Sequence, residues 1–173
     1  NLVLTGSAAI NGTGNELDNV LTGNSAANVL TGLAGNDTYV IGTGDTVVEA
    51  AGGGTDTVVS GITHSLAANV ENLTLVGFSA INGTGNALDN VLNGLLSLAG
   101  NTLTGGAGNY TYMIGGGDTV GEAANGGTDT VHSLATHTLG ANVENLTLTG
   151  IAAINGTGNG LNNTLTGNNS TNT

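Results

Sequence analysis

Carboxylates are the reactive groups that stand out in this chain, because the sequence offers them no basic partner. Its 173 residues include 12 Asp and Glu, three His and no Lys or Arg, so the formal net charge at pH 7 is −12. Such carboxylates repel one another unless a cation lies among them, and their oxygens are the ligands that hard divalent cations prefer. The best candidate ligands are four acids in the first half of the chain and three counterparts in the second: Asp37, Asp45, Glu49, Asp56, Asp118, Glu122 and Asp129.

The composition also argues against several classes of function. Nucleic-acid binding and attraction to anionic membranes both need Lys or Arg against phosphate, and the chain has neither. No stretch approaches the ~18 consecutive apolar residues that indicate a membrane-spanning helix. No Ser-His-Asp spacing, basic phosphate clamp or paired-carboxylate signature stands out, so we do not expect an enzyme.

The three histidines do not suggest a metal or catalytic centre. His64 and His137 occupy equivalent positions of an internal repeat, and His132 lies shortly before the latter. A zinc site needs three or four converging ligands, and the chain contains no Cys to contribute to one. We therefore expect the histidines to occupy outward-facing strand positions.

The internal repeat dictates the elements that position these side chains. Residues 1–71 begin NLVLTGSAAINGTGNELDNVLTG, and residues 72–144 begin NLTLVGFSAINGTGNALDNVLNG. A truncated third copy, residues 145–173, begins NLTLTGIAAINGTGNGLNNTLTG. The second copy is slightly longer than the first because of an insertion near residues 95–101. We expect these long repeats to form a single domain.

Each long repeat contains a shorter nonapeptide period. Glycine recurs at Gly14, Gly23 and Gly32, and an apolar strand residue follows at a constant distance after each of them. Two such periods make one coil of turn, strand, turn and strand. Stacked coils pair through parallel backbone hydrogen bonds, and each coil buries its apolar side chains against its neighbours. The sequence therefore predicts an all-β fold, a parallel β-solenoid of about nine or ten stacked coils.

One turn carries a calcium-binding pattern. Residues 32–40, GLAGNDTYV, match the nonapeptide G-G-x-G-x-D-x-U-x at every position except the second glycine. With this turn and the segments GTGNELDNVLTG, EAAGGGTDTV and NVENLTLTG, the chain resembles RTX-like (hemolysin-type calcium-binding) repeat proteins of the bacterial secreted and surface type. The resemblance implies Ca²⁺ as the cofactor, held by carbonyl groups of the glycine-rich turns and by the turn Asp.

The chain departs from this pattern at several turns. Asn19 and Asn28 replace Asp at two of three turn positions in the first long repeat, and Tyr110 stands where the second long repeat would have its carboxylate. An amide is a weaker calcium ligand than a carboxylate, and turn Asn readily bonds neighbouring backbone. We expect a few calcium sites, with most turns held by Asn side chains.

Together these features predict a structural protein. We expect an extracellular, secreted or cell-surface β-solenoid that forms filaments by head-to-tail association of identical copies, because each end of a solenoid exposes apolar side chains and an unpaired strand edge. Calcium outside cells would neutralise some carboxylates. The alternative is a stalk or ligand-binding segment of a large RTX-like adhesin. Neither a nucleic-acid partner nor membrane insertion is expected.

Overall fold

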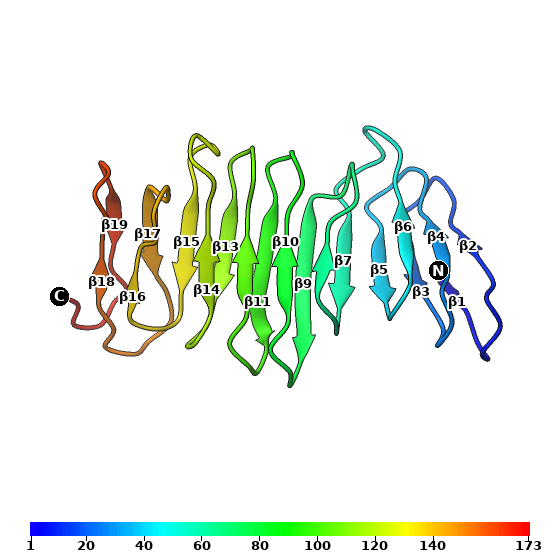
Figure 1. Cartoon of the computed structure of the whole chain (residues 1–173), viewed down its shortest axis with the longest axis horizontal. Helices are drawn as coiled ribbons and strands as arrows, with labels where there is room; N and C mark the ends of the chain where they lie inside the picture. The colour runs from blue at the N-terminus through cyan, green and yellow to red at the C-terminus, as the bar shows by residue number, and fades with distance from the viewer.

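The computed structural model describes residues 1–173 as one stack of 19 short strands without a helix (Figure 1). The odd-numbered strands are β1 (Leu2–Val3), β3 (Val20–Thr22), β5 (Thr38–Ile41), β7 (Thr57–Ser60), β9 (Asn72–Gly77), β11 (Val91–Ser97), β13 (Thr111–Ile114), β15 (Thr130–Ser133), β17 (Asn145–Leu148) and β19 (Thr164–Thr166). The even-numbered strands are β2 (Gly12–Thr13), β4 (Val29–Thr31), β6 (Thr46–Val48), β8 (His64–Ser65), β10 (Asn82–Thr84), β12 (Thr102–Thr104), β14 (Thr119–Gly121), β16 (His137–Thr138) and β18 (Gly156–Thr157).

The odd-numbered strands pair in sequence order to form one ten-stranded sheet. The even-numbered strands form three smaller sheets, β2-β4-β6, β8-β10-β12-β14 and β16-β18. The chain therefore winds from one side to the other, and its termini lie at opposite ends of the stack (Figure 1). Because every pairing is parallel and joins strands of successive coils, the predicted all-β parallel solenoid is confirmed, with about 9 turns.

The register between strands sets the length of each coil. Leu2 pairs with Leu21, which is typical of the longer coils, and the inserted residues of the second long repeat coincide with a register shift between Asn93 and Leu96. Two coils are shorter, because Thr57 pairs with Asn72 and Thr130 pairs with Asn145. These two short coils hold the less regular part of each long repeat.

The core is a narrow column of side chains between the two sides of the stack. Alternation along a strand sends every second side chain inward. In the ten-stranded sheet, register aligns one inward residue per coil, and all but the two terminal members are at most 1% exposed: Leu2, Leu21, Tyr39, Val58, Leu73, Leu92, Tyr112, Val131, Leu146 and Leu165. Each coil thus buries its apolar residues against the coils on either side.

Asparagine amides close several of the corners, as predicted. The Oδ1 atom of Asn90 accepts the N–H of Asn86 at 2.7 Å within its own turn, and its Nδ2 donates to the carbonyl of Val70 one coil earlier at 3.0 Å. Asn163 repeats the arrangement, with bonds to Asn159 N–H and Val143 O. One amide therefore both closes a turn and links two coils, which satisfies its donor and its acceptor.

The even-numbered side is interrupted between β6 and β8 and again between β14 and β16, where no pairing joins the strands. The prediction of outward-facing histidines is wrong at both of these places. His64 pairs with the buried Gly83, its Nε2 atom is buried, and the following Ser65 is exposed. His137 pairs with the half-buried Gly156, its Nε2 atom is buried and the following Thr138 is exposed. His132 lies between two buried residues of β15 and faces outward. The alternation of each strand, set by its apolar residues, decides these directions.

Candidate functional site

Three acidic side chains meet inside one corner of the first long repeat. Asp37 immediately precedes β5, Asp56 immediately precedes β7 one coil later, and Glu49 immediately follows β6 on the other side of the stack. One carboxylate oxygen from each lies within 4.8 Å of the other two. Asp37 is 1% exposed, Asp56 0% and Glu49 9%. The solenoid therefore gathers three acids from separate turns into one buried cluster.

The two aspartates form part of a ladder between coils. Asp37 Oδ1 accepts the N–H of Asn19 at 2.7 Å, and Asp56 Oδ1 accepts the N–H of Asp37 at 2.8 Å. Glu71 continues the ladder by accepting the N–H of Asp56 at 2.8 Å. The remaining oxygens, Asp37 Oδ2 and Asp56 Oδ2, are buried and have no hydrogen-bond partner. Unlike an asparagine at the same corner, a carboxylate has no N–H with which to satisfy the neighbouring carbonyls.

Glu49 is held against a core tyrosine. The Tyr39 hydroxyl donates to Glu49 Oε1 in a short contact, and the N–H of Ala50 donates to Oε2 at 3.0 Å. Gly32 completes the arrangement, because a Cβ at that position would overlap Asp37 Oδ2, Glu49 Oε1 and the Tyr39 hydroxyl. Three oxygens therefore point at one spot beside the main chain, and only glycine leaves room for them.

Burial makes the charged forms of these acids costly. Burial, followed by the charges of Asp56, Asp37 and Glu71, raises the pKa of Glu49 to about 7. Burial is also the main cause that raises the pKa of Asp37 and of Asp56, against the lowering effect of the backbone N–H groups that donate to them. The cluster therefore holds excess negative charge poorly by itself and would be stabilised by protons or by a cation.

The donor set fits a hard divalent cation. Oxygens that share one Ca²⁺ at ~2.3–2.6 Å lie no more than about 5 Å apart, which agrees with the 4.8 Å spread of the cluster. The Oδ2 atoms of Asp37 and Asp56 accept no hydrogen bond, so both are free to act as ligands. Gly32 has no side chain that would block Asp37 Oδ2. Asp37, Glu49 and Asp56 are therefore the residues that would hold calcium, and it would supply charge neutralisation and cross-linking of coils.

The second long repeat lacks the same cluster. Tyr110 stands at the position of Asp37, is 1% exposed and stacks on Tyr112 with ring centroids 5.8 Å apart. Its hydroxyl donates to the carbonyl of Asn86 in a short contact, and Tyr112 similarly binds Glu122. Asp129 accepts the N–H of Tyr110 at 2.8 Å and has an unpaired, buried Oδ2. Glu122 and Asp129 are thus the counterparts of Glu49 and Asp56, and the phenol of Tyr110 replaces the third carboxylate.

Asp45 and Asp118 lie at the other corner of the coil, immediately before β6 and β14. Asp45 accepts the N–H groups of Asn28 at 2.9 Å and Gly42 at 2.8 Å, one with each carboxylate oxygen. Asp118 accepts from the N–H groups of Asn101 and Gly115 in the same way, both at 2.8 Å. Both carboxylates therefore close turns and link coils, and neither joins the acidic cluster.

Sequence reasoning misses the parts that complete the cluster. The repeat pattern indicates Tyr39 only as a strand residue, and it does not single out Glu71, although Glu71 binds the backbone of Asp56. The signal available in the sequence is the recurrence of a Tyr–Glu pair, Tyr39 with Glu49 and Tyr112 with Glu122, at the same spacing. An inward tyrosine needs a partner for its hydroxyl, and in each long repeat the glutamate after the next strand supplies it.

Comparison of the chain with protein-family models, with curated proteins and with solved structures finds no match. The structure contains no helix that is long and apolar enough to cross a lipid bilayer.

Proposed function

We propose that this chain is a structural, non-enzymatic element of an extracellular filament, built by head-to-tail stacking of β-solenoids and stiffened by calcium. The observation that carries the proposal is the continuous parallel register of ten odd-numbered strands, which has an unpaired strand at each end. A parallel stack of this kind has the same backbone pattern at every level, so it accepts a further coil without any new type of contact.

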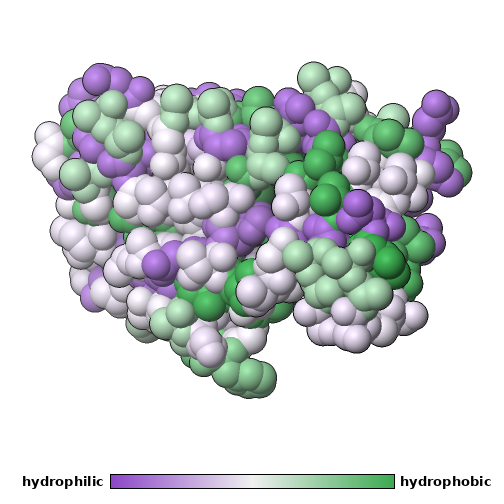
Figure 2. Space-filling view, turned by 45° about the vertical axis from the view of Figure 1, so that its right-hand side comes forward, coloured by the Kyte–Doolittle hydropathy of each residue, from purple (hydrophilic) through white to green (hydrophobic).

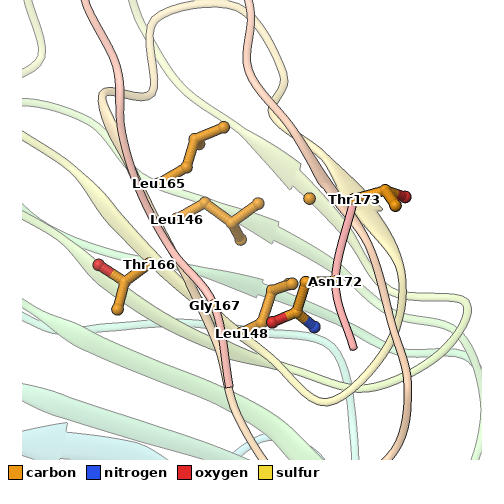
Figure 3. Close-up of a pocket in the computed structure, with 8 residues that line it drawn as sticks. Leu146, Leu148, Leu165, Thr166, Gly167, Asn172 and Thr173 are labelled. Carbon is orange, nitrogen blue, oxygen red and sulfur yellow. The ribbon is translucent and has the colours of Figure 1, made fainter. Parts of the chain in front are cut away.

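The exposed end coil supports this proposal. Leu165 belongs to the inward column of the ten-stranded sheet, but it is 48% exposed, whereas Leu146 one coil earlier is 1% exposed. A recess of about 180 Å³ lies at this end, and the side chains of Leu146, Leu148 and Leu165 gather beside it (Figure 3). Pairing of β1 from a second copy with β19 would place Leu2 against Leu165 and remove apolar surface from water.

Charge supports a role for calcium in such a filament. Two copies with a formal net charge of −12 each repel one another, and neither has Lys or Arg with which to form ion pairs. A cation in the cluster of Asp37, Glu49 and Asp56 lowers that charge and joins coils through side chains that already bridge them. The calcium concentrations found outside cells suit sites of modest affinity.

Electron microscopy of the purified chain, divided between millimolar calcium and excess chelator, tests the proposal. Filaments with an axial repeat of one chain length are expected in calcium, with shorter or fewer filaments in chelator. A matched variant, Leu165→Asp, places a charge in the exposed inward column without touching the acidic cluster and should abolish stacking. Single particles under both conditions would contradict the filament and leave a spacer within a longer chain.

A specific surface feature favours the alternative of a ligand-binding segment in an adhesin. The outward column of the even-numbered strands contains no charge and is rich in hydroxyl groups, with Val48 and Gly121 as its members without one. Its hydroxyl-bearing members are Thr13, Thr31, Ser65, Thr84, Thr104, Thr138 and Thr157. The face of the molecule in Figure 2 mixes hydrophilic, intermediate and hydrophobic residues without one continuous apolar patch. Hydroxyl side chains in a row suit an uncharged, hydroxyl-rich ligand such as a neutral polysaccharide.

Co-sedimentation with insoluble neutral polysaccharides tests this second function. Binding that is retained in chelator and in high salt, and is lost when Thr84 and Thr104 are replaced by Glu, would support the adhesin. The same substitutions on the opposite sheet, Thr74→Glu and Thr147→Glu, are the matched control. Equal binding by all variants, or no binding by the original chain, would contradict it.

A further inference from the structure

Two histidines occupy leucine positions inside the solenoid. Inward positions of the even-numbered strands are filled by Leu30 in β4 and Leu103 in β12, which are fully buried. His64 in β8 and His137 in β16 occupy the corresponding positions of their strands, each paired with a glycine. The next inward residue after His64 is Leu66, which is 7% exposed. Each imidazole therefore projects from its strand toward the core with its Nε2 atom buried, while each histidine as a whole is half-buried.

The imidazole groups find no polar partner in the core. The Nε2 atoms of His64 and His137 are both buried without a hydrogen bond. Burial alone lowers the pKa of each imidazole, with no contribution from a neighbouring charge. A neutral imidazole tolerates this environment, whereas in an imidazolium the buried Nε2–H would be a charged donor without a partner, which is unfavourable.

No acid stands close enough to rescue the charged form. Around His64, the strands β6, β7, β9 and β10 carry no titratable side chain, and Glu49 beyond the end of β6 is bound to Tyr39. Around His137, the strands β14, β17 and β18 carry none, and His132 in β15 faces outward. Glu122, beyond the end of β14, is bound to Tyr112.

Both histidines lie where the stack has the fewest backbone links. β8 is the first strand of its four-stranded sheet and β16 is the first of its two-stranded sheet, so neither pairs with the even-numbered strand before it. The same two places hold the short coils, in which Thr57 pairs with Asn72 and Thr130 with Asn145. Local opening of a protein occurs most readily where backbone pairing is missing.

We propose that His64 and His137 are acid-sensitive release points, at which the even-numbered side of the solenoid opens when its surroundings become mildly acidic. The unfolded chain binds protons at ordinary histidine values of about 6.5, whereas the folded chain resists them. The free energy of unfolding is therefore unaffected by these two histidines above that pH, and it decreases as the pH falls below it. Each long repeat contributes one release point, and neither depends on the acidic cluster or on calcium.

Thermal unfolding of the full chain at pH 7.5 and pH 5.0, without calcium, tests the proposal. The test variant is the double substitution His64→Leu and His137→Leu, which restores the leucine found at other positions of the column. The control is His132→Leu on the outward face. Lowering the pH also protonates the acidic groups, which are the same in the original protein and in both variants. The informative quantity is therefore the difference in unfolding midpoint between the proteins. The midpoint of the original chain and of the control should fall by at least about 2–4 °C relative to the double variant at the lower pH.

A parallel change in all three chains would overturn the proposal. Proton NMR of the three imidazole groups in the original chain provides a second measurement that does not depend on the variants folding. The imidazoles of His64 and His137 should titrate below the ordinary histidine value of about 6.5, and their titration should coincide with faster amide exchange in β8 and β16 than in β4. Titration of either group at the ordinary value would also overturn the proposal.

Discussion

The first and second long repeats build the same corner with different chemistry. In the first, Asp37, Glu49 and Asp56 converge, and two of their oxygens lack any partner. In the second, Tyr110 replaces the first aspartate, stacks on Tyr112 and carries its hydroxyl to a backbone carbonyl. One corner therefore concentrates buried acidic groups that protons or a cation would neutralise, and the other has an aromatic ring at the equivalent position of the sequence.

A solenoid corner therefore has two ways to stabilise a buried acidic group. Replacing one of three repelling carboxylates with an aromatic ring reduces the buried negative charge that a corner must hold, and at the second corner Asp129 still has an unpaired, buried Oδ2. Retaining all three makes the corner dependent on protons or a cation, because burial raises the pKa of each member. Because the surrounding backbone hydrogen bonds are the same, the two corners can be compared directly within one chain.

The largest expected loss of stability comes from substituting the equivalent glycines of the two corners, Gly32 and Gly105. Gly32→Val should lower the free energy of unfolding by about 3 kcal/mol, because the new side chain overlaps Asp37, Glu49 and Tyr39. Gly105→Val should be about as costly, since Glu122 and Tyr112 point at that glycine. Urea unfolding measures both, with Gly160→Val as the control because nothing lies within 4 Å of that position. An unchanged free energy of unfolding for Gly105→Val would show that the packing around Gly105 differs from that around Gly32.

Calcium should act on the first corner alone. Saturation at about 100 times the dissociation constant should raise the free energy of unfolding by ~2.7 kcal/mol. The double substitution Asp37→Asn and Asp56→Asn should remove this gain, whereas Glu122→Gln and Asp129→Asn should leave it unchanged. Thermal unfolding with and without calcium measures the gain in each chain. Equal loss in both double variants would show that the two corners do not differ in cation binding.

Tyr110→Asp should convert the second corner into a copy of the first. The substitution removes the ring stack and the bond to the Asn86 carbonyl, so the calcium-free chain should lose about 2 kcal/mol of stability. Isothermal titration should then detect about two calcium ions per chain in place of about one. Tyr112→Phe is the matched control, because it removes a tyrosine hydroxyl without adding a carboxylate. Unchanged stoichiometry would contradict the interpretation of Tyr110.

The smallest expected effect is the pH dependence of the calcium-free chain. A carboxyl group whose pKa is raised on folding stabilises the protein below its unfolded value, and this contribution is lost as the pH rises through the folded value. For Glu49 that loss extends up to about 7, because burial raises its pKa to that value. Glu49→Gln should therefore flatten the decline in stability between pH 5 and pH 7.5 relative to the original chain, measured by urea unfolding. Saturating calcium should flatten the decline in the original chain alone.

The repeated sequence contains enough local information to predict the architecture. A regularly recurring glycine followed by an apolar strand residue allows few arrangements other than stacked coils, and the parallel register follows from repeating the same unit. The Asn-rich turns are also predictable, because an amide can bond its own turn and the adjacent coil. The candidate acids Asp37, Glu49 and Asp56 are identifiable for a related reason, as acids in turns without basic partners.

The direction of individual side chains is less accessible to sequence reasoning. His64 and His137 are polar, which predicts that they face water, but the alternation of β8 and β16 is set by Leu66 and Leu139, which require the inward side. A strand of two residues has too short a pattern to reveal its own phase. The register with Gly83 and Gly156 reveals that phase, because the paired residues share one face.

Local spacing and charge, both readable from the sequence, establish the repeat, the parallel coils and the set of acids without counterions. Which of these acids meet is decided by the tertiary structure. Asp45 and Asp118 each bond backbone N–H groups with both oxygens, whereas Asp37 and Asp56 are left with unpaired oxygens beside Glu49. The physical reason is that winding brings residues from successive turns to one corner, so acids meet only where they lie at the same corner of adjacent coils.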